Sequence, residues 1–368
     1  MTDRRPPGTS KGVTLETLRA QAERGDVGAQ LALCDALDAQ GRHEEALKWL
    51  GTAARAGSLA AMTSLGARLV LGAAAPRSMA DGVDLLEFAA RSGDGRAARH
   101  MAVLHGVGLD GAPDWQGALE WLHRAGEAGD FLAKEDLDLL TTGSGMEEPG
   151  AISIGRNIDL STWLREPPVR LLSSAPHIGV VENFLGAAFR NWLIRHARDG
   201  LRPALVTDAG RGAATSDAAR TNSFATVNVL EMPMPILLLR SQMAAIVGQK
   251  PAHFEPMNIL SYETGQRYDV HHDYMDPDEP GFRQELSTLG QRVATFLVYL
   301  NDDFHDGETA FVDIGIRHRG RAGDALYFMN VTPDGRPDRR TRHAGLPPSR
   351  GRKWLLSQWV RDRPQPIA

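Results

Sequence analysis

The sequence predicts two differently built domains, an α-helical repeat solenoid followed by a β-rich domain of the sandwich or barrel class. Residues up to about Leu140 are rich in Ala, Leu and Gly and poor in β-branched residues, and their apolar positions follow a helical period. After about Ala204, short β-rich segments alternate with Gly, Asp and Pro turns, which is typical of an all-β fold. A chain of 368 residues is long enough for two domains that each bury a core.

The helical half contains an internal repeat built on glycine and alanine. Its glycines are spaced by 32, 36 and 36 residues (25 to 57, 57 to 93 and 93 to 129), and an alanine follows each one by four positions. The resulting pairs are Gly25 and Ala29, Gly57 and Ala61, Gly93 and Ala97, and Gly129 and Ala133. A period in the mid-thirties predicts stacked helix pairs, with glycine in the turn and a small residue where helices approach closely.

This A-x-x-G-x-x-x-A pattern resembles the Sel-one-like repeats, which are relatives of the tetratricopeptide repeat. The resemblance covers about residues 14–140, although Gly126 replaces the first alanine in the last copy. It implies a helical solenoid whose concave face binds a protein partner. The alternative is an unrelated Ala-rich helical bundle.

The rest of the chain divides by composition. Residues 1–13 are expected to form a flexible tail, and residues 141–175, with a Gly/Ser/Pro-rich start and Pro167-Pro168, a linker to the β-rich domain at 176–368. Helices are expected over Leu185–Arg198 and Gln242–Val247. Strands are expected over Phe224–Leu230, Asn258–Tyr262, Val293–Leu300, Ala325–Phe328 and Lys353–Arg361.

Charge and composition exclude several classes of protein. A net charge of −5 and a pI near 6.2 argue against a dedicated nucleic-acid or membrane-surface protein. Cys34 is the single cysteine, which fits a reducing compartment. The sequence has neither a signal-peptide pattern nor an apolar run long enough to span a membrane. We therefore expect a cytoplasmic protein with no nucleic-acid or membrane partner.

A candidate metal site consists of His271, Asp273 and the distant His343. The H-x-D triplet alone is close to what chance provides, so its context decides. Because side chains alternate along a strand, His271 and Asp273 face one side while His272 faces the other. Two histidines and one carboxylate can hold one face of a non-haem Fe(II) ion and leave the opposite positions open.

Lys353 is a candidate for binding a carboxylate ligand. In the strand over 353–361, Lys353 and Trp359 share a face that carries no acidic residue. A lysine that faces a barrel interior needs a negative partner, since an unpaired buried charge is very costly. Because no acidic residue shares its strand face, Lys353 is available to bind the carboxylate of a ligand.

Several spaced motifs resemble those of the prolyl 4-hydroxylase-like 2-oxoglutarate/Fe(II) dioxygenases, over about residues 177–361. The segment Y-E-T-G-Q-R-Y-D-V-H-H-D at 262–273 is similar to the family's Y-x-x-G-Q-x-Y-x-x-H-x-D signature. The segments R-V-A-T-F-L-V-Y at 292–299, G-E-T-A-F at 307–311, G-D-A-L-Y-F at 323–328 and H-A-G-L-P-P-S-R-G-R-K-W at 343–354 follow in the family's order. Val270, in place of a common proline, and Arg342, beside His343, depart from the pattern.

The resemblance implies a double-stranded β-helix (jelly-roll) domain with flanking helices. It implies Fe(II), 2-oxoglutarate and O2 as cofactor and co-substrates, with ascorbate as a candidate reductant. Carried over by position, His271, Asp273 and His343 would hold the iron, and Lys353 would pair with the C5 carboxylate of 2-oxoglutarate. Tyr262 and Tyr299 would complete that co-substrate pocket, and Arg292 and Trp359 would line the substrate side as catalytic-site residues.

The expected function is hydroxylation of an unactivated C–H bond, foremost that of a prolyl residue in a protein, coupled to decarboxylation of 2-oxoglutarate to succinate. The helical repeats would recruit the protein partner. Two alternatives stay open: a small-molecule or amino-acid oxygenase on the same fold, and a non-catalytic scaffold. Residues 313–363 hold eleven arginines and Lys353 against five acidic residues, either as a groove for an acidic substrate or as solvated loops with offset charges.

Overall fold

The computed structural model describes residues 14–108, 111–142, 158–204, 206–208, 213–215, 220–226, 230 and 232–365. It divides into two compact units, of which the first comprises the described residues up to Ala102 together with Leu119–Asp130. The second comprises Val103–Ala118 and the described residues from Phe131 on. The expected helical domain over 14–140 is thus one run of helices whose last part belongs to the second unit. The expected tail at 1–13 lies outside the described residues.

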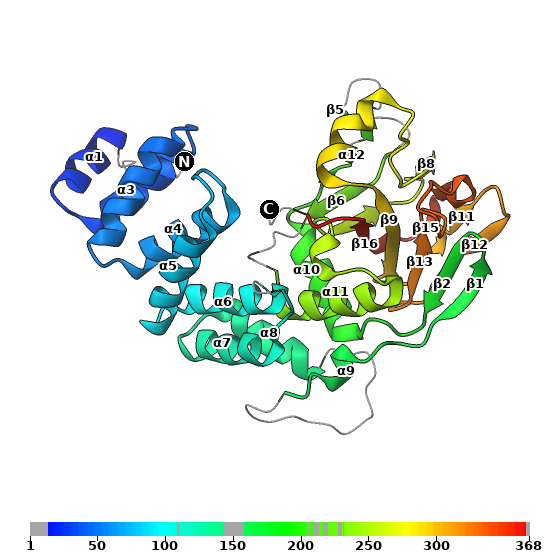
Figure 1. Cartoon of the computed structure of the whole chain (residues 1–368), viewed down its shortest axis with the longest axis horizontal. Coiled ribbons are helices and arrows are strands. Elements are labelled where there is room, and N and C mark those ends of the chain that lie inside the picture. The colour runs from blue at the N-terminus through cyan, green and yellow to red at the C-terminus, as the bar shows by residue number, and fades with distance from the viewer. Residues whose placement is uncertain are drawn as a thin grey trace, which may run out of the picture. The chain divides into compact units, whose positions relative to one another are not determined.

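Eight helices follow one another in the N-terminal part of the chain, joined by short turns (Figure 1). They are α1 (Leu15–Glu23), α2 (Val27–Asp38), α3 (His43–Arg55), α4 (Leu59–Leu71), α5 (Met79–Arg91), α6 (Gly95–Val107), α7 (Trp115–Glu127) and α8 (Phe131–Thr142). The four repeat glycines end α1, α3, α5 and α7, and all have positive φ, between 90° and 99°. Glycine reaches this left-handed region without the strain that a side chain would cause.

Small residues allow the helices to pack closely, as the repeat pattern predicts. The repeat alanines Ala29, Ala61, Ala97 and Ala133 are all buried. Where α4 meets α5, a Cβ atom added at Gly66 would lie 2.8 Å from the carbonyl oxygen of Gly82, and one added at Gly82 would lie 2.8 Å from the carbonyl of Gly66. Only glycine fits either position without moving a backbone. The predicted helical repeat solenoid is confirmed.

The second unit is built on antiparallel sheets (Figure 1). The large sheet has the order β1-β2-β13-β9-β16-β7-β6-β3, and a smaller sheet has the order β12-β11-β14-β8. The large-sheet strands are β1 (Arg170–Ser174), β2 (His177–Val181), β3 (Arg202–Pro203), β6 (Ser223–Thr226), β7 (Asn258–Tyr262), β9 (Arg292–Tyr299), β13 (Ala325–Met329) and β16 (Lys353–Arg361). The smaller sheet contains β8 (Tyr268–His271), β11 (Thr309–Phe311), β12 (Ile316–His318) and β14 (His343–Gly345).

Two short strand pairs complete the sheets of the second unit. They are β4 (Val206–Asp208) with β5 (Ala213–Thr215), and β10 (His305–Asp306) with β15 (Pro348–Arg350). The hydrophobic core lies between the two main sheets, because Phe311 of β11 belongs to the same buried cluster as Leu260, Leu297 and Phe328 of the large sheet. Two facing antiparallel sheets with a shared core are the predicted double-stranded β-helix, which is confirmed.

Helices α10 (Ala187–Arg198) and α11 (Met234–Val247) lie beside the large sheet (Figure 1). The helix expected over Gln242–Val247 extends back to Met234, whose backbone N–H donates to Asp136 Oδ2 at 3.0 Å. Pro235 in the first turn is compatible with this start, since a first-turn residue needs no intrahelical N–H. The first half of α11 is buried on every side, so its sequence shows no amphipathic period.

The expected linker over 141–175 contains ordered elements in its described part. The short helix α9 (Ser161–Leu164) buries Trp163, whose indole N–H donates to the carbonyl of Leu140 at 3.3 Å. Strand β1 pairs with β2 and so belongs to the large sheet. Within the described residues, no helix is both long and apolar enough to cross a membrane.

Candidate metal and co-substrate site

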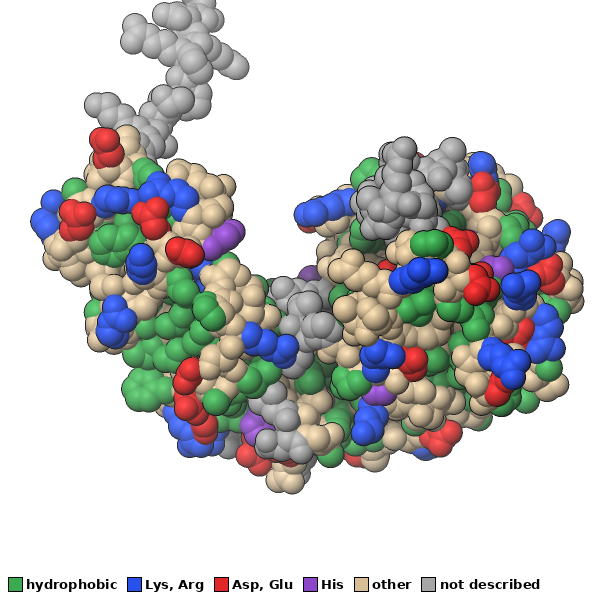
Figure 2. Space-filling view, turned by 45° about the horizontal axis from the view of Figure 1, so that its top comes forward, with side chains coloured by type: hydrophobic (Ala, Val, Ile, Leu, Met, Phe, Trp, Pro, Cys, Tyr) green, Lys and Arg blue, Asp and Glu red, His purple; other side chains and the backbone are tan. Residues whose placement is uncertain are grey.

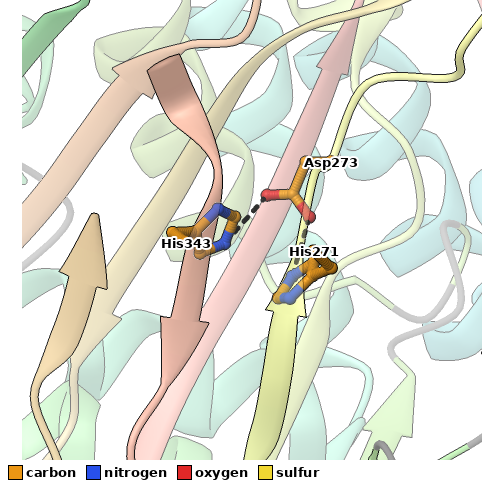
Figure 3. Close-up of side chains that lie close together, drawn as sticks. All are labelled: His271, Asp273 and His343. Carbon is orange, nitrogen blue, oxygen red and sulfur yellow. Dashed lines mark ion pairs between the residues drawn. The ribbon is translucent and has the colours of Figure 1, made fainter. Parts of the chain in front are cut away.

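The two histidines of the predicted triad lie side by side on neighbouring strands. Strands β8 and β14 pair with His271 directly opposite His343, and the ring centres are 4.3 Å apart. Asp273 follows the end of β8 by two residues, and its carboxylate turns back between the two rings (Figure 3). The structure therefore brings all three residues together, although only the histidines belong to strands.

Distances and burial within this triad suit a metal ion. Asp273 Oδ1 lies 3.5 Å from His271 Nε2, and Asp273 Oδ2 lies 3.7 Å from His343 Nε2 (Figure 3). One ligand atom from each residue falls within 4.8 Å of the others. His343 and Asp273 are buried and His271 is partly buried. Two imidazoles and one carboxylate on one side of a cavity are the donor set of a non-haem Fe(II) site, so the residues fit the ion that the sequence suggests.

Backbone carbonyls fix the tautomer of both histidines. The Nδ1–H of His271 donates to the carbonyl oxygen of Asp269 at 2.8 Å, and that of His343 donates to the carbonyl oxygen of Thr341 at 3.0 Å. Because a carbonyl can only accept, each Nδ1 carries the hydrogen and each Nε2 presents a lone pair. Such outer contacts orient metal-binding histidines in general.

The charge states of the triad also favour a cation. Burial and, to a smaller extent, the neighbouring His271 lower the pKa of His343 to about 4, so its imidazole is neutral near pH 7. Burial alone would raise the pKa of Asp273, but the adjacent histidines and a hydrogen bond from Thr295 hold it well below its usual value. A neutral imidazole and an ionised carboxylate are the forms that bind metal.

Lys353 lies fully buried in the same pocket as the triad. Its Nζ donates to the carbonyl of Gly307 at 2.6 Å, which is the one hydrogen bond that the described residues give it. Burial lowers the pKa of Lys353 to about 7, although the charge of Glu308 opposes this shift. An ammonium group has three N–H donors, so two remain for the carboxylate of a ligand.

Both predicted tyrosines lie beside Lys353, with ring centres 5.2 and 5.7 Å from its Nζ, but their hydroxyl groups have different surroundings. Tyr262 pairs with Lys353 across β7 and β16, lines the pocket, and has its ring centre 5.2 Å from Lys353 Nζ. Tyr299 is not among the described residues that line the pocket. Its hydroxyl donates to the carbonyl of His318 at 3.0 Å and lies 3.3 Å from Thr309 Oγ1. Burial raises the pKa of both phenols, so both stay protonated at neutral pH.

Arg292 and Trp359 lie next to each other at one side of the site. The guanidinium carbon of Arg292 is 3.8 Å from the centre of the Trp359 ring, and Trp359 lines the pocket. Arg292 is not among the described lining residues, because its Nε and Nη2 both donate to Glu255, at 2.6 and 2.9 Å. Trp359 Nε1 is buried and finds no hydrogen-bond acceptor among the described residues. Of the two, Trp359 is the one whose side chain lines the pocket.

Several residues that line the pocket were not predicted from the sequence. Besides the residues already placed, the lining includes Arg220, Leu260, Tyr268, Leu297, Thr309, Gly345, Leu355 and Ser357. Tyr268 stacks on the ring of His271, with centres 3.5 Å apart, and Arg220 lies 4.6 Å from the Tyr268 ring on an isolated bridge between the two residues. Strict strand alternation would place Tyr268, three positions before His271, on the opposite face, and an irregular register between β8 and β14 brings the two rings together instead. Neither Tyr268 nor Arg220 could therefore have been found from local alternation.

His272 points away from the triad, as strand alternation predicts. Its Nε2 lies 3.1 Å from the carbonyl oxygen of Arg339, outside the pocket lining. The arginines of residues 313–363 are largely paired: Arg340 with Asp338, Arg342 with Asp313, and Arg361 with Glu255. Figure 2 shows Lys and Arg interspersed with Asp and Glu over the visible surface of the second unit. This mixture fits offset charges better than an arginine-lined groove.

Comparison with known proteins places these residues in a family context. Residues 257–361 match the model of the 2OG-Fe(II) oxygenase superfamily. A probable prolyl 4-hydroxylase 9 of Arabidopsis thaliana is 31% identical over 246 residues, which cover 62% of this chain and 82% of that protein. The viral collagen prolyl hydroxylase of Paramecium Bursaria Chlorella virus-1 is 24% identical, covers 50% of this chain and 94% of its own, and has a TM-score of 0.38. A Sel1 repeat protein from Oxalobacter formigenes is 29% identical over 34% of this chain and 96% of its own, with a TM-score of 0.30.

Proposed function

We propose that this chain, which belongs to the prolyl 4-hydroxylase-like enzymes of the 2OG-Fe(II) oxygenase superfamily, hydroxylates a prolyl residue of a protein or peptide. The observation that carries the proposal is the meeting of His271, Asp273 and His343 with the buried Lys353 in one pocket. When bound, Fe(II) and 2-oxoglutarate let O2 oxidise an unactivated C–H bond while 2-oxoglutarate loses CO2 and leaves as succinate. Ascorbate, as the reductant, belongs to the same proposal.

In this proposal the triad binds the metal and Lys353 orients the co-substrate. The two Nε2 atoms and the Asp273 carboxylate lie close enough together to hold one metal ion, and this donor set would leave further coordination positions to small molecules. The ammonium of Lys353, with two free N–H donors, takes the far carboxylate of 2-oxoglutarate. Tyr262 lines the same pocket, and its hydroxyl would donate a second hydrogen bond to that carboxylate.

Aromatic side chains support a prolyl substrate. Tyr268 and Trp359 line the pocket beside the triad, and aromatic side chains pack well against a small apolar ring such as that of proline. The Trp359 Nε1–H, which finds no acceptor in the described part of the chain, can donate to a backbone carbonyl next to the target residue. We further propose that the helical repeats bind the protein that carries the target, and that the enzyme acts in the cytoplasm.

A product assay tests this function against its alternatives. The full chain is incubated with Fe(II), 2-oxoglutarate and ascorbate, together with proline-containing peptides or with free amino acids, and the products are read by mass spectrometry. We expect peptides to gain one oxygen atom on proline as succinate forms. The variant His271→Ala should form no product. The variant His272→Ala should keep its activity, because the wild-type His272 ring bonds to the carbonyl of Arg339 outside the pocket. Oxidation of free amino acids alone would contradict a protein substrate.

A further inference from the structure

A chain of buried hydrogen bonds leads from Asp273 into the large sheet. The hydroxyl of Thr295 donates to Asp273 Oδ2 at 2.8 Å, and the side-chain amide of Asn330 donates to Thr295 Oγ1 at 3.0 Å. Asp273, Thr295 and Asn330 are 5%, 1% and 0% exposed, so water does not compete for these bonds.

The direction of each bond follows from the groups involved. An ionised carboxylate only accepts, and a hydroxyl has one hydrogen, so the hydrogen of Thr295 must point to Asp273. The lone pairs of Thr295 then face Asn330, which must present its NH2 group. The Asn330 backbone is held on both sides: its N–H donates to the carbonyl of Val293 at 2.8 Å, and its carbonyl accepts from the N–H of Asp338 at 2.9 Å.

Asp273 needs this support more than the two histidines do. Both His271 and His343 belong to paired strands, and a backbone carbonyl orients each ring. Asp273 lies beyond the end of β8, where strand pairing no longer fixes the backbone. Thr295 belongs to β9 and Asn330 directly follows β13, two strands that pair with each other. The hydrogen bonds therefore link the one ligand outside a strand to the large sheet.

We propose that Thr295, oriented by Asn330, is a positioning residue that holds the carboxylate of Asp273 in the plane required for metal binding. The inference rests on the metal site of the proposed function. Without the Thr295 hydroxyl, Asp273 can rotate away from the histidines, and the metal must restore its orientation on binding. Loss of such an outer contact weakens metal affinity about 10- to 100-fold.

Metal binding tests the role of Thr295 directly, without turnover. Mn(II) affinity is measured by titration with electron paramagnetic resonance, and the Co(II) site is monitored by its visible spectrum. Thr295→Val, which keeps the shape but removes the hydroxyl, should weaken Mn(II) binding about 10- to 100-fold and alter the Co(II) spectrum. Thr295→Ser should restore both. Asn330→Leu, which removes the N–H donor, should weaken binding less than Thr295→Val does.

A matched control separates positioning from general damage to the fold. Thr63 is equally buried, and its hydroxyl donates to the carbonyl of Leu59 within α4 rather than to a triad residue. Thr63→Val should bind Mn(II) as the wild type does, and thermal unfolding without metal shows that each variant folds. Unchanged affinity in Thr295→Val, or no recovery in Thr295→Ser, would overturn the inference and leave the proposed function intact. Failure of the wild-type chain to bind either metal would instead contradict the proposed function, and the inference with it.

Discussion

Lys353 and Tyr262 face each other on one rung of the large sheet, with the ammonium 5.2 Å from the centre of the phenol ring. Lys353 and Tyr262 give the pocket a cation and a hydroxyl donor, whereas Asp273 of the triad gives the same pocket an anion. A buried ammonium bonded to one carbonyl is costly for the folded protein. This cost is offset if the carboxylate of a ligand accepts hydrogen bonds from the two remaining N–H groups of Lys353.

Replacing Lys353 by methionine tests this explanation. We expect Lys353→Met to raise the 2-oxoglutarate concentration needed for turnover at least roughly tenfold, since a close ion pair is lost and only part of its energy is offset by desolvation. Mn(II) binding to the triad should be unchanged. The exposed Lys250→Met serves as the control for loss of a positive charge. An unchanged 2-oxoglutarate requirement would remove Lys353 from the co-substrate site.

The same substitution should make the protein more stable. Because burial lowers the pKa of Lys353 to about 7 from an ordinary value of 10.5, the unfolded chain binds a proton that the folded chain releases between these pH values. Wild-type stability should therefore rise with pH across this window, and Lys353→Met should remove that rise. At pH 7 we expect the variant to be more stable by at least about 1 kcal/mol, measured by chemical denaturation.

Binding of 2-oxoglutarate should weaken as the pH rises above about 7. The ammonium form of Lys353 predominates below its pKa of about 7, and above it the ligand can bind only if the side chain takes up a proton. Affinity in the presence of Mn(II) should then fall up to about tenfold per pH unit, as measured by calorimetry. In Lys353→Met the affinity should be weak at every pH. A flat profile in the wild type would show that this lysine keeps its charge throughout.

Glu255 is expected to stabilise the fold rather than act on the substrate. Its carboxylate lies between the guanidinium groups of Arg292 and Arg361, and Arg361 also bonds to Glu285. Glu255→Gln leaves the buried Arg361 and the partly buried Arg292 without this shared anion, which should cost about 3 kcal/mol of unfolding free energy. The control Glu263→Gln removes an exposed pair with Arg352 and should change stability by less than about 1 kcal/mol. Equal effects of the two changes would contradict a stabilising role for the buried pair.

Glycine packing between α4 and α5 is open to a similar comparison. A methyl group at Gly82 would lie 2.8 Å from the carbonyl of Gly66 and 2.9 Å from the backbone nitrogen of Val70. Gly82→Ala should therefore force the helices apart and destabilise the first unit by about 1 to 3 kcal/mol. Gly51→Ala adds a methyl group 3.4 Å from the flexible end of Arg55, and should be neutral or stabilising. Circular dichroism during thermal unfolding checks both variants.

Features that depend on residues close together in the sequence could be predicted from it. The glycine and alanine of each repeat fix a turn and a close helix contact within a few residues, so the period alone predicted the helix pairs. Alternation within β8 likewise selected His271 over His272. Asp273 is a partial exception, because it lies beyond the strand and is oriented by Thr295, a residue on another strand.

The rest of the site depends on which strands become neighbours. β16 lies between β9 and β7, although β7 and β9 come long before it in sequence, and this order sets Lys353 opposite Tyr262. Tyr299 has the strand face expected of a pocket residue, yet its hydroxyl reaches the carbonyl of His318 instead. Arg292 likewise donates its hydrogen bonds to Glu255 instead of lining the pocket. Such competing partners come from distant segments that local patterns do not contain.

The most direct test of the account is the coupling of succinate formation to prolyl oxidation. The wild-type chain with Fe(II) and 2-oxoglutarate should release one succinate for each oxygen atom added to proline in a peptide. His271→Ala should abolish both products together, while His272→Ala should preserve both. Succinate formation that is independent of any proline-containing peptide, or product formation in His271→Ala, would contradict the account.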